Sequence, residues 1–242
     1  MELIIVDNYQ ELSERAAMLI VAEVEAKPRA VLGLATGSTP EGMYAELVKL
    51  NSEGKVDFSG ITTFNLDEYA GLAPEHEQSY YYYMRHHLFN QVKIRAEQIN
   101  MPSCDLENVD QFCFEYDQRI AAAGGIDLQV LGIGGNGHIG FNEPGDQLRV
   151  PTHLVDLTED TILANSRFFS SVEAVPKQAV TMGLGSIMLA NKIILLAAGK
   201  AKAEAITRTV SGLITTSVPA SILQLHRDVT IIVDREAAGL LS

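Results

Sequence analysis

Residues 126–145, IDLQVLGIGGNGHIGFNEPG, join a short apolar run to a glycine-rich turn. The apolar run is typical of a buried strand, and similar runs recur at 3–7, 30–35, 61–66, 152–157, 192–198 and 229–234. Helical patterns lie between them, as in residues 9–27, where apolar side chains repeat along one stripe. This alternation predicts one α/β domain over residues 1–242, with a doubly wound, mostly parallel sheet and helices on both faces.

The glycines at 132–137 match the G-x-G-x-x-G pattern of a dinucleotide-binding turn. That site needs a helix beginning at the last glycine, because the pyrophosphate lies at the helix N-terminus. Two more glycines and a proline follow within eight residues, which disfavours a helix. We therefore interpret the segment as a turn that presents Asn136, His138 and Glu143, and not as an NAD site.

Composition restricts the class of protein. The chain is 47% apolar and 20% charged, as is ordinary for a globular protein, and its net charge of −13 disfavours binding to nucleic acid or anionic membranes. No apolar run approaches the ~20 residues of a membrane span, and the N-terminus does not resemble a signal peptide. Cys104 and Cys113 have neither a C-x-x-C nor a metal-ligand spacing. We expect a cytoplasmic protein with reduced cysteines and no metal site.

Ligands of doubly wound sheets bind outside the carboxyl ends of the strands. The strand predicted at 30–35 is followed by three hydroxyl residues and a glycine: Thr36, Gly37, Ser38 and Thr39. We expect Thr39 to cap a helix that has Pro40 at its first position. Hydroxyls and unpaired amides at a helix N-terminus form a site for an anion, whereas a capped turn without a ligand is the alternative.

The strand predicted at 61–66 ends in two adjacent acids, Asp67 and Glu68. Successive side chains of a strand point to opposite sides, so we expect only one of them to face a ligand. A carboxylate in a partly dry pocket has a raised pKa and suits proton abstraction beside a carbonyl group, although an isolated acidic pair is as typical of a solvated turn. His138, with an amide and a carboxylate nearby, forms an oriented acid/base unit, which favours a catalytic site.

Five segments together resemble the glucosamine-6-phosphate deaminase family, also called isomerases, from end to end. They are GLATGSTPEG, TTFNLDEYAGL, LGIGGNGHIGFNEPG, NSRFF and LQLHRDV. The resemblance implies conversion of glucosamine 6-phosphate and water to fructose 6-phosphate and ammonia, without a cofactor. It also implies a small-molecule sugar phosphate as the partner of the protein.

The resemblance assigns roles to four residues. Asp67 removes the proton at carbon 2 of the sugar and passes it towards carbon 1. His138 opens the pyranose ring, and Glu143 and Asn136 support that step. Many members have Asp at the position of Asn136, so we expect an altered pH dependence with retained activity.

The resemblance also implies a phosphate site. It is formed by Gly37, Ser38 and Thr39, by Arg167 and by Lys202, with Lys200 as an alternative to Lys202. Arg167 offers a planar fork to phosphate oxygens and Lys202 a point charge. Residues within 157–183 are expected to close over the sugar as a lid.

Two rival functions are a 6-phosphogluconolactonase, which shares this fold, and a sugar-phosphate-sensing domain without catalysis. The sensor needs a DNA-binding helix pair, and the printed chain begins directly with a predicted strand. The family includes hexamers activated by N-acetylglucosamine 6-phosphate and shorter members. Because the chain ends with IIVDREAAGLLS and has no longer tail, we expect a monomer without that regulation.

Residues 79–87, SYYYYMRHH, carry four consecutive tyrosines. Four consecutive side chains cannot share one face of a helix. We expect some of them to be packed and others to meet solvent, with contact to a substrate as the alternative.

Overall fold

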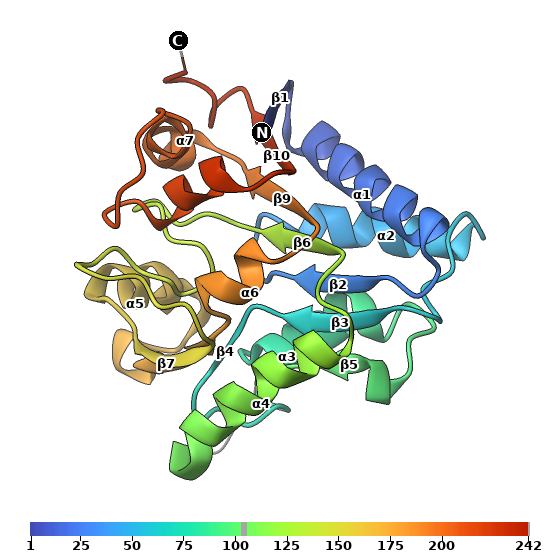
Figure 1. Ribbon diagram of the computed structural model, residues 1–242, viewed down its shortest axis with the longest axis horizontal. Coiled ribbons are helices and arrows are strands. Elements are labelled where there is room, and N and C mark those ends of the chain that lie inside the picture. Colours follow the sequence, from blue (N-terminus) through green and yellow to red (C-terminus); the bar gives the residue numbers. More distant parts are fainter. Residues whose placement is uncertain (103–105, 242) are drawn as a thin grey trace.

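The computed structural model describes residues 1–102 and 106–241. Its main element is a seven-stranded sheet in the order β1-β10-β9-β6-β2-β3-β5, with parallel neighbours throughout (Figure 1). The strands are β1 (Glu2–Val6), β2 (Val31–Leu34), β3 (Thr62–Asn65), β5 (Ile99–Asn100), β6 (Leu128–Leu131), β9 (Lys192–Ala197) and β10 (Val229–Asp234). Every residue of β2 and β6 is buried, as expected where helices cover both faces of a sheet.

Helices cover the two faces of this sheet, with α4 and α6 in front of it and α2 behind it in Figure 1. The helices are α1 (Tyr9–Ala26), α2 (Glu41–Ser52), α3 (Tyr80–Met84), α4 (Val109–Ala122), α5 (Glu159–Asn165), α6 (Leu184–Met188) and α7 (Ala203–Thr209). Short 3-10 segments and one π-helical turn, η1 (Arg85–Phe89), connect them. The predicted α/β class and doubly wound parallel sheet are confirmed.

A second sheet was not predicted. It is antiparallel, in the order β4-β8-β7, with β4 (Asp67–Tyr69), β7 (His153–Asp156) and β8 (Gln178–Thr181). The apolar run at 152–157 therefore contributes to this small sheet and not to the parallel one. Tyr69, Phe141, Leu157 and Ala179 form a separate apolar cluster beside it. The small sheet matters for function because its strand β4 begins with Asp67.

The expected cap of the helix after β2 is wrong. Helix α2 begins at Glu41, Pro40 occupies the N-cap position, and no side chain caps it from there. Pro40 already has helical backbone angles (φ −81°, ψ −4°), so the turn winds into the helix one residue later than predicted. The amide of Gly42, in the first turn, donates instead to the hydroxyl of Tyr9 on α1, at 2.8 Å.

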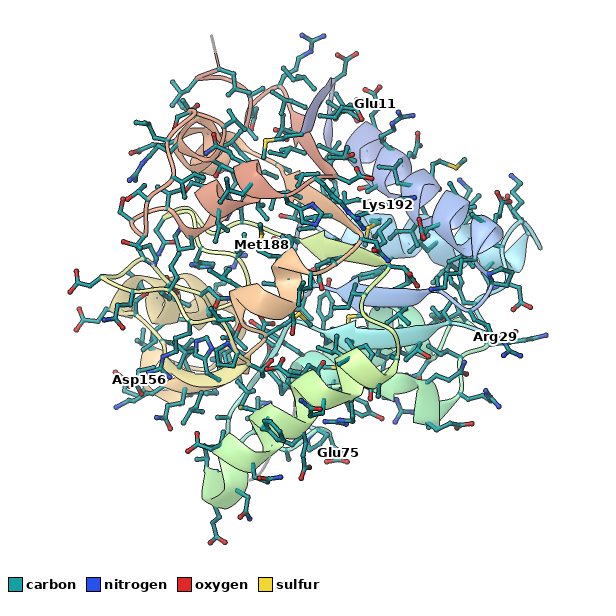
Figure 2. All side chains as sticks on the ribbon, viewed as in Figure 1. Glu11, Arg29, Glu75, Asp156, Met188 and Lys192 are labelled. Atoms are coloured by element: carbon teal, nitrogen blue, oxygen red, sulfur yellow. The ribbon has the colours of Figure 1, made fainter. Side chains whose placement is uncertain are left out.

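Charged side chains lie mainly on the outside of the molecule, as Figure 2 shows for Arg29, Glu75 and Asp156. Cys113 is buried in α4, and Cys104 lies outside the described residues. Within the described ranges, no helix combines the length and the apolar character needed to cross a membrane.

Candidate active site

The order of the strands brings three loops together. Strand β6 pairs with β2 on one side and with β9 on the other, so the segments after these strands leave the same edge of the sheet. The chain passes from β2 outwards to β3 and β5 before it returns to β6, which makes the gap between β2 and β6 the switch point where ligands bind. The loops at 132–137 and 199–202 touch, because a Cβ on Gly135 would lie 3.7 Å from the carbonyl oxygen of Ala201.

His138, Asn136 and Glu143 form one hydrogen-bonded unit in the loop after β6. His138 Nδ1 lies 3.1 Å from Glu143 Oε2, and Asn136 Nδ2 donates to the same oxygen at 2.8 Å. The backbone amide of His138 donates to Asn136 Oδ1 at 3.1 Å. An ionised carboxylate can only accept, so Nδ1 carries a proton and Nε2 is left to exchange one with a ligand. An ionised Asp at position 136 could not donate in the way that Asn136 does.

Glu143 is ionised and firmly held. Burial acts to raise the pKa of Glu143, but the hydrogen bond and charge of His138, together with hydrogen bonds from Thr161 and Asn136, outweigh it and hold the pKa below its ordinary value. The hydroxyls of Thr158, the N-cap residue of α5, and of Thr161, in its first turn, donate to Glu143 Oε1. A negative carboxylate fixed in this way orients the His138 ring and keeps the proton on its Nδ1.

Two glycines of the G-x-G-x-x-G pattern allow this geometry. A Cβ on Gly134 would lie 2.4 Å from Cε1 of the His138 ring, so only glycine lets the ring lie against the backbone here. Gly137 has a φ of 90°, a conformation that favours glycine, and its amide donates to the carbonyl of Gly134 at 3.0 Å. No helix begins between residues 132 and 145. The glycines thus shape a turn around His138.

Asp67 is a buried carboxylate that accepts no hydrogen bond from the described residues. Burial, and after it the charge of Glu68, raise the pKa of Asp67 to about 8. A Cβ on Gly140 would lie 3.6 Å from Asp67 Oδ2, so the carboxylate lies beside the loop that carries His138. A carboxyl group with a pKa near neutrality can both take and return a proton.

Glu68 serves a different purpose from its neighbour. Its carboxylate is buried and accepts the backbone amides of Tyr69, Tyr80 and Tyr81, at 2.9, 2.9 and 2.8 Å. Two of these amides belong to the first turn of α3, where a negative charge is favourable. Glu68 therefore anchors α3, which leaves Asp67 as the acid of the pair that is available to a ligand.

The turn after β2 has the features of an anion site. Gly37 has a φ of 99°, and Gly37 and Ser38 are exposed, while Thr36 and Thr39 are half-buried. Within residues 1–102 and 106–241, the amides of residues 36–39 donate to no other group. A short run of unpaired amides of this kind binds anions.

Two of the three predicted cations lie near each other. Lys202 ends the 3-10 turn Lys200–Lys202 after β9 and is half-buried. Burial, and after it the charge of Arg167, lower the pKa of Lys202, which places the two cations within electrostatic reach. Lys200 is exposed. This geometry favours Lys202 over Lys200 as the lysine of the site.

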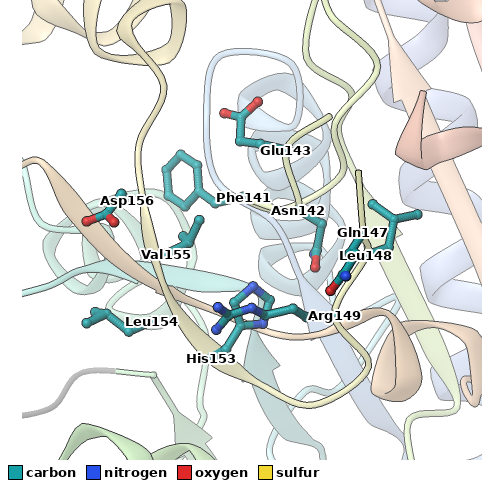
Figure 3. Close-up of a pocket in the computed structure, with 10 residues that line it drawn as sticks. All are labelled: Phe141, Asn142, Glu143, Gln147, Leu148, Arg149, His153, Leu154, Val155 and Asp156. Atoms are coloured by element: carbon teal, nitrogen blue, oxygen red, sulfur yellow. The ribbon is translucent and has the colours of Figure 1, made fainter. Parts of the chain in front are cut away.

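A pocket of about 280 Å³ opens beside Glu143, between the loop at 141–149 and β7. Arg149 and His153 lie next to each other in it, and Asp156 lies at one end (Figure 3). Sequence reasoning missed this pocket because it singled out none of its lining residues except Glu143. It also missed Thr158 and Thr161, for which the hydroxyls in the first turn of a predicted helix would have been the signal.

Comparisons with known proteins show the family to which the chain belongs. Residues 7–232 match the family described as glucosamine-6-phosphate isomerases/6-phosphogluconolactonase. A glucosamine-6-phosphate deaminase of Thermoanaerobacter sp. (strain X514) is 56% identical over 100% of this chain and 95% of its own. A solved monomeric glucosamine-6-phosphate deaminase has a TM-score of 0.96 at 44% identity, over 99% of this chain and 100% of its own. A 6-phosphogluconolactonase from Leishmania guyanensis, with a TM-score of 0.76 at 22% identity over 100% and 98%, shares the fold.

The buried carboxyl group of Asp67 predicts a pH-dependent stability difference. Between the ordinary pKa of 3.8 and the raised pKa of about 8, the folded protein holds a proton that the unfolded chain releases, so this contribution to stability is lost as the pH rises. Relative to wild type, Asp67→Asn should gain on the order of 1 kcal/mol of unfolding free energy per pH unit from pH 5 to 8.

Urea unfolding at several pH values measures this difference. The variant Asp146→Asn, which removes an exposed carboxylate, shows how much of the slope comes from the loss of one negative charge. A stability difference between Asp67→Asn and wild type that stays constant from pH 5 to 8 would contradict the raised pKa.

Proposed function

The chain belongs to the family of glucosamine-6-phosphate isomerases and 6-phosphogluconolactonases, and we propose that it acts as a glucosamine-6-phosphate deaminase. The reaction converts glucosamine 6-phosphate and water to fructose 6-phosphate and ammonia. The observation that carries this proposal is the pair of acid/base groups beside one loop. One is the buried Asp67, which accepts no hydrogen bond from residues 1–102 and 106–241, and the other is His138, oriented by Glu143. An aldose-to-ketose conversion of a cyclic sugar needs one group for ring opening and another for proton transfer between carbons.

The phosphate of the substrate is held at the turn after β2. Unpaired amides of residues 36–39 receive phosphate oxygens, and Arg167 and Lys202 supply two positive charges. The lowered pKa of Lys202 reflects burial and a neighbouring cation, and a bound dianion offsets both. A chain with a net charge of −13 thus holds a dianion by local groups. Fixing the phosphate orients the sugar between the two acid/base groups.

Ring opening falls to His138. Its Nε2 takes the proton of the anomeric hydroxyl, and a proton is returned to the ring oxygen as the bond between carbon 1 and that oxygen breaks. Glu143 keeps the proton on Nδ1 and stabilises the positive charge that forms on the ring. Asn136 helps by holding both Glu143 and the backbone of His138.

Proton transfer falls to Asp67. The ionised carboxylate removes the proton from carbon 2 of the open-chain sugar, and the electrons of that bond form a double bond between carbons 1 and 2. The π electrons of the carbon 1 carbonyl group move to its oxygen, which takes a proton from water. The same carboxyl group returns the proton to carbon 1, which leaves an imine at carbon 2. Water adds to the imine, and ammonia leaves. The pKa of about 8 suits a group that gives up its proton again within each cycle.

The residues of the site and the sequence identities favour a deaminase over a 6-phosphogluconolactonase and over a sensing domain. Lactone hydrolysis, the reaction of a 6-phosphogluconolactonase, needs no base at carbon 2, so Asp67 would have no task. The relative named as a deaminase is 56% identical, whereas the lactonase structure is 22% identical. A sensing domain would need neither Asp67 nor the oriented His138.

The oligomeric state, a lid, the cellular location and the pH dependence belong to the same proposal. The solved neighbour at 44% identity is described as monomeric, and we infer a monomer here as well. The lid expected within residues 157–183 includes β8, which pairs with β4 and β7 in the small sheet, so we propose that the part that closes lies ahead of β8. The cytoplasmic location and the altered pH dependence from Asn136 stay predictions.

The two candidate lysines can be separated by matched variants. Lys202→Ala should raise the KM for glucosamine 6-phosphate about 10- to 100-fold, because it removes a partly buried cation from the phosphate. Lys200→Ala should leave the KM within about twofold, because Lys200 is exposed. Steady-state kinetics measure both values. Equal effects of the two variants would contradict the assignment of Lys202.

The function itself is tested by the release of ammonia and fructose 6-phosphate from glucosamine 6-phosphate. Wild type should turn over, and Asp67→Asn should lose about 10²- to 10⁴-fold in kcat, the range for a general base. Asp146→Asn should match wild type. An inert wild type that still binds the sugar phosphate would overturn the proposal, and 6-phosphogluconolactone would be the next substrate to test.

A further inference from the structure

Tyrosine hydroxyls hold the turn after β2 from outside. The hydroxyl of Tyr83, on α3, donates to the carbonyl oxygen of Gly37 at 2.8 Å. The hydroxyl of Tyr9, on α1, lies 3.0 Å from the carbonyl oxygen of Ser38 and 3.1 Å from that of Thr39 and shares its proton between them. Three successive carbonyl groups of the turn are therefore bound by two side chains from two helices.

A third tyrosine extends this arrangement inwards. Tyr44, on α2, is fully buried, and its hydroxyl donates to the carbonyl oxygen of Ala35 at 2.6 Å. Its ring meets the ring of Tyr83 edge to face, with centroids 6.4 Å apart. Burial holds the pKa of both Tyr44 and Tyr83 above the ordinary value, so these hydroxyls stay protonated donors.

These contacts fix the direction of the amides. A trans peptide unit is planar, and its C=O and the following N–H point to opposite sides. Binding the carbonyl of Gly37 on one side thus directs the amide of Ser38 to the other, and binding the carbonyl of Ser38 does the same for the amide of Thr39. Tyr44 binds the carbonyl of Ala35 and so directs the amide of Thr36 in the same way. These are the amides without a partner among the described residues.

Tyr9 is itself held in place by α2. Its hydroxyl accepts the amide of Gly42 at 2.8 Å, which satisfies one of the unpaired amides at the start of that helix. A Cβ on Gly42 would lie 2.3 Å from Ser13 Oγ and 3.1 Å from Tyr9 Cε1. Glycine at this position therefore lets α1 approach closely enough for Tyr9 to reach the turn.

Tyr83 is connected to the strand that carries Asp67. Glu68, the next residue, binds the amides of Tyr80 and Tyr81 in the first turn of α3. Tyr83 follows in that helix and reaches Gly37. The contacts thus run without a gap from the strand of Asp67 to the turn after β2, which fixes the position of one relative to the other.

We propose that Tyr9 and Tyr83 are positioning residues that preorganise the amides of Ser38 and Thr39 for a phosphate monoester dianion, with Glu68 setting the position of Tyr83. This inference rests on the proposed function, in which that turn binds the phosphate of the substrate. Preorganised amides bind an anion without reorientation, so loss of either hydroxyl weakens binding of the phosphate and leaves the acid/base groups intact.

The test compares Tyr83→Phe and Tyr9→Phe with Tyr82→Phe. Tyr82 is 41% exposed and its hydroxyl makes no hydrogen bond to the described residues, so its variant is a matched control. The measurements are kcat and KM for glucosamine 6-phosphate, the inhibition constant of inorganic phosphate, and the melting temperature. Each of the first two variants should raise KM and the inhibition constant together by about 2- to 12-fold, the effect of one hydrogen bond, with kcat within twofold. Tyr82→Phe should change none of them.

Two results would overturn the inference. One is a lower melting temperature with unchanged KM and inhibition constant, which would make the tyrosines supports of the fold alone. The other is a fall in kcat with an unchanged inhibition constant, which would place their effect on the chemistry. If wild type does not turn over the sugar, the proposed function fails, but calorimetric binding of inorganic phosphate to the same variants still decides the role of the tyrosines.

Discussion

The site depends on the parallel pairing of β6 with β2 on one side and β9 on the other. Each of these strands is short, and the loop that follows it contributes a different kind of group: amides after β2, an oriented histidine after β6 and a cation after β9. None of the three loops contains the whole site. Backbone hydrogen bonds in the buried sheet fix their relative positions, so the site is supported by paired, buried strands.

The surroundings of two carboxyl groups of the site shift their pKa values in opposite directions. Glu143 accepts hydrogen bonds from His138, Asn136 and Thr161, which hold its pKa low and keep it charged. Asp67 is buried and accepts no hydrogen bond from the part of the chain that the structure describes, and its pKa rises to about 8. We therefore propose that the first is a fixed charge and the second an exchangeable base. Hydrogen bonding and burial set this difference, because the two carboxyl groups are chemically alike.

Sequence patterns predicted the α/β class because apolar runs and helical stripes alternate along the chain. They indicated Asp67 and His138 because polar residues that follow buried strands stand out. The small antiparallel sheet could not be predicted, since β4 has three residues and pairs with β8 much later in the chain. The hydroxyl contacts of Tyr9 and Tyr83 likewise depend on the packing of distant segments, for which local patterns carry no signal.

The central claim is that one buried carboxyl group carries a proton from carbon 2 to carbon 1. Glucosamine 6-phosphate labelled with deuterium at carbon 2 tests this most directly, with the product analysed for deuterium at carbon 1. Because Asp67 is only 7% exposed, a measurable fraction of the label should be retained in the fructose 6-phosphate. Complete loss of the label to water at every extent of reaction would contradict transfer by a single shielded base.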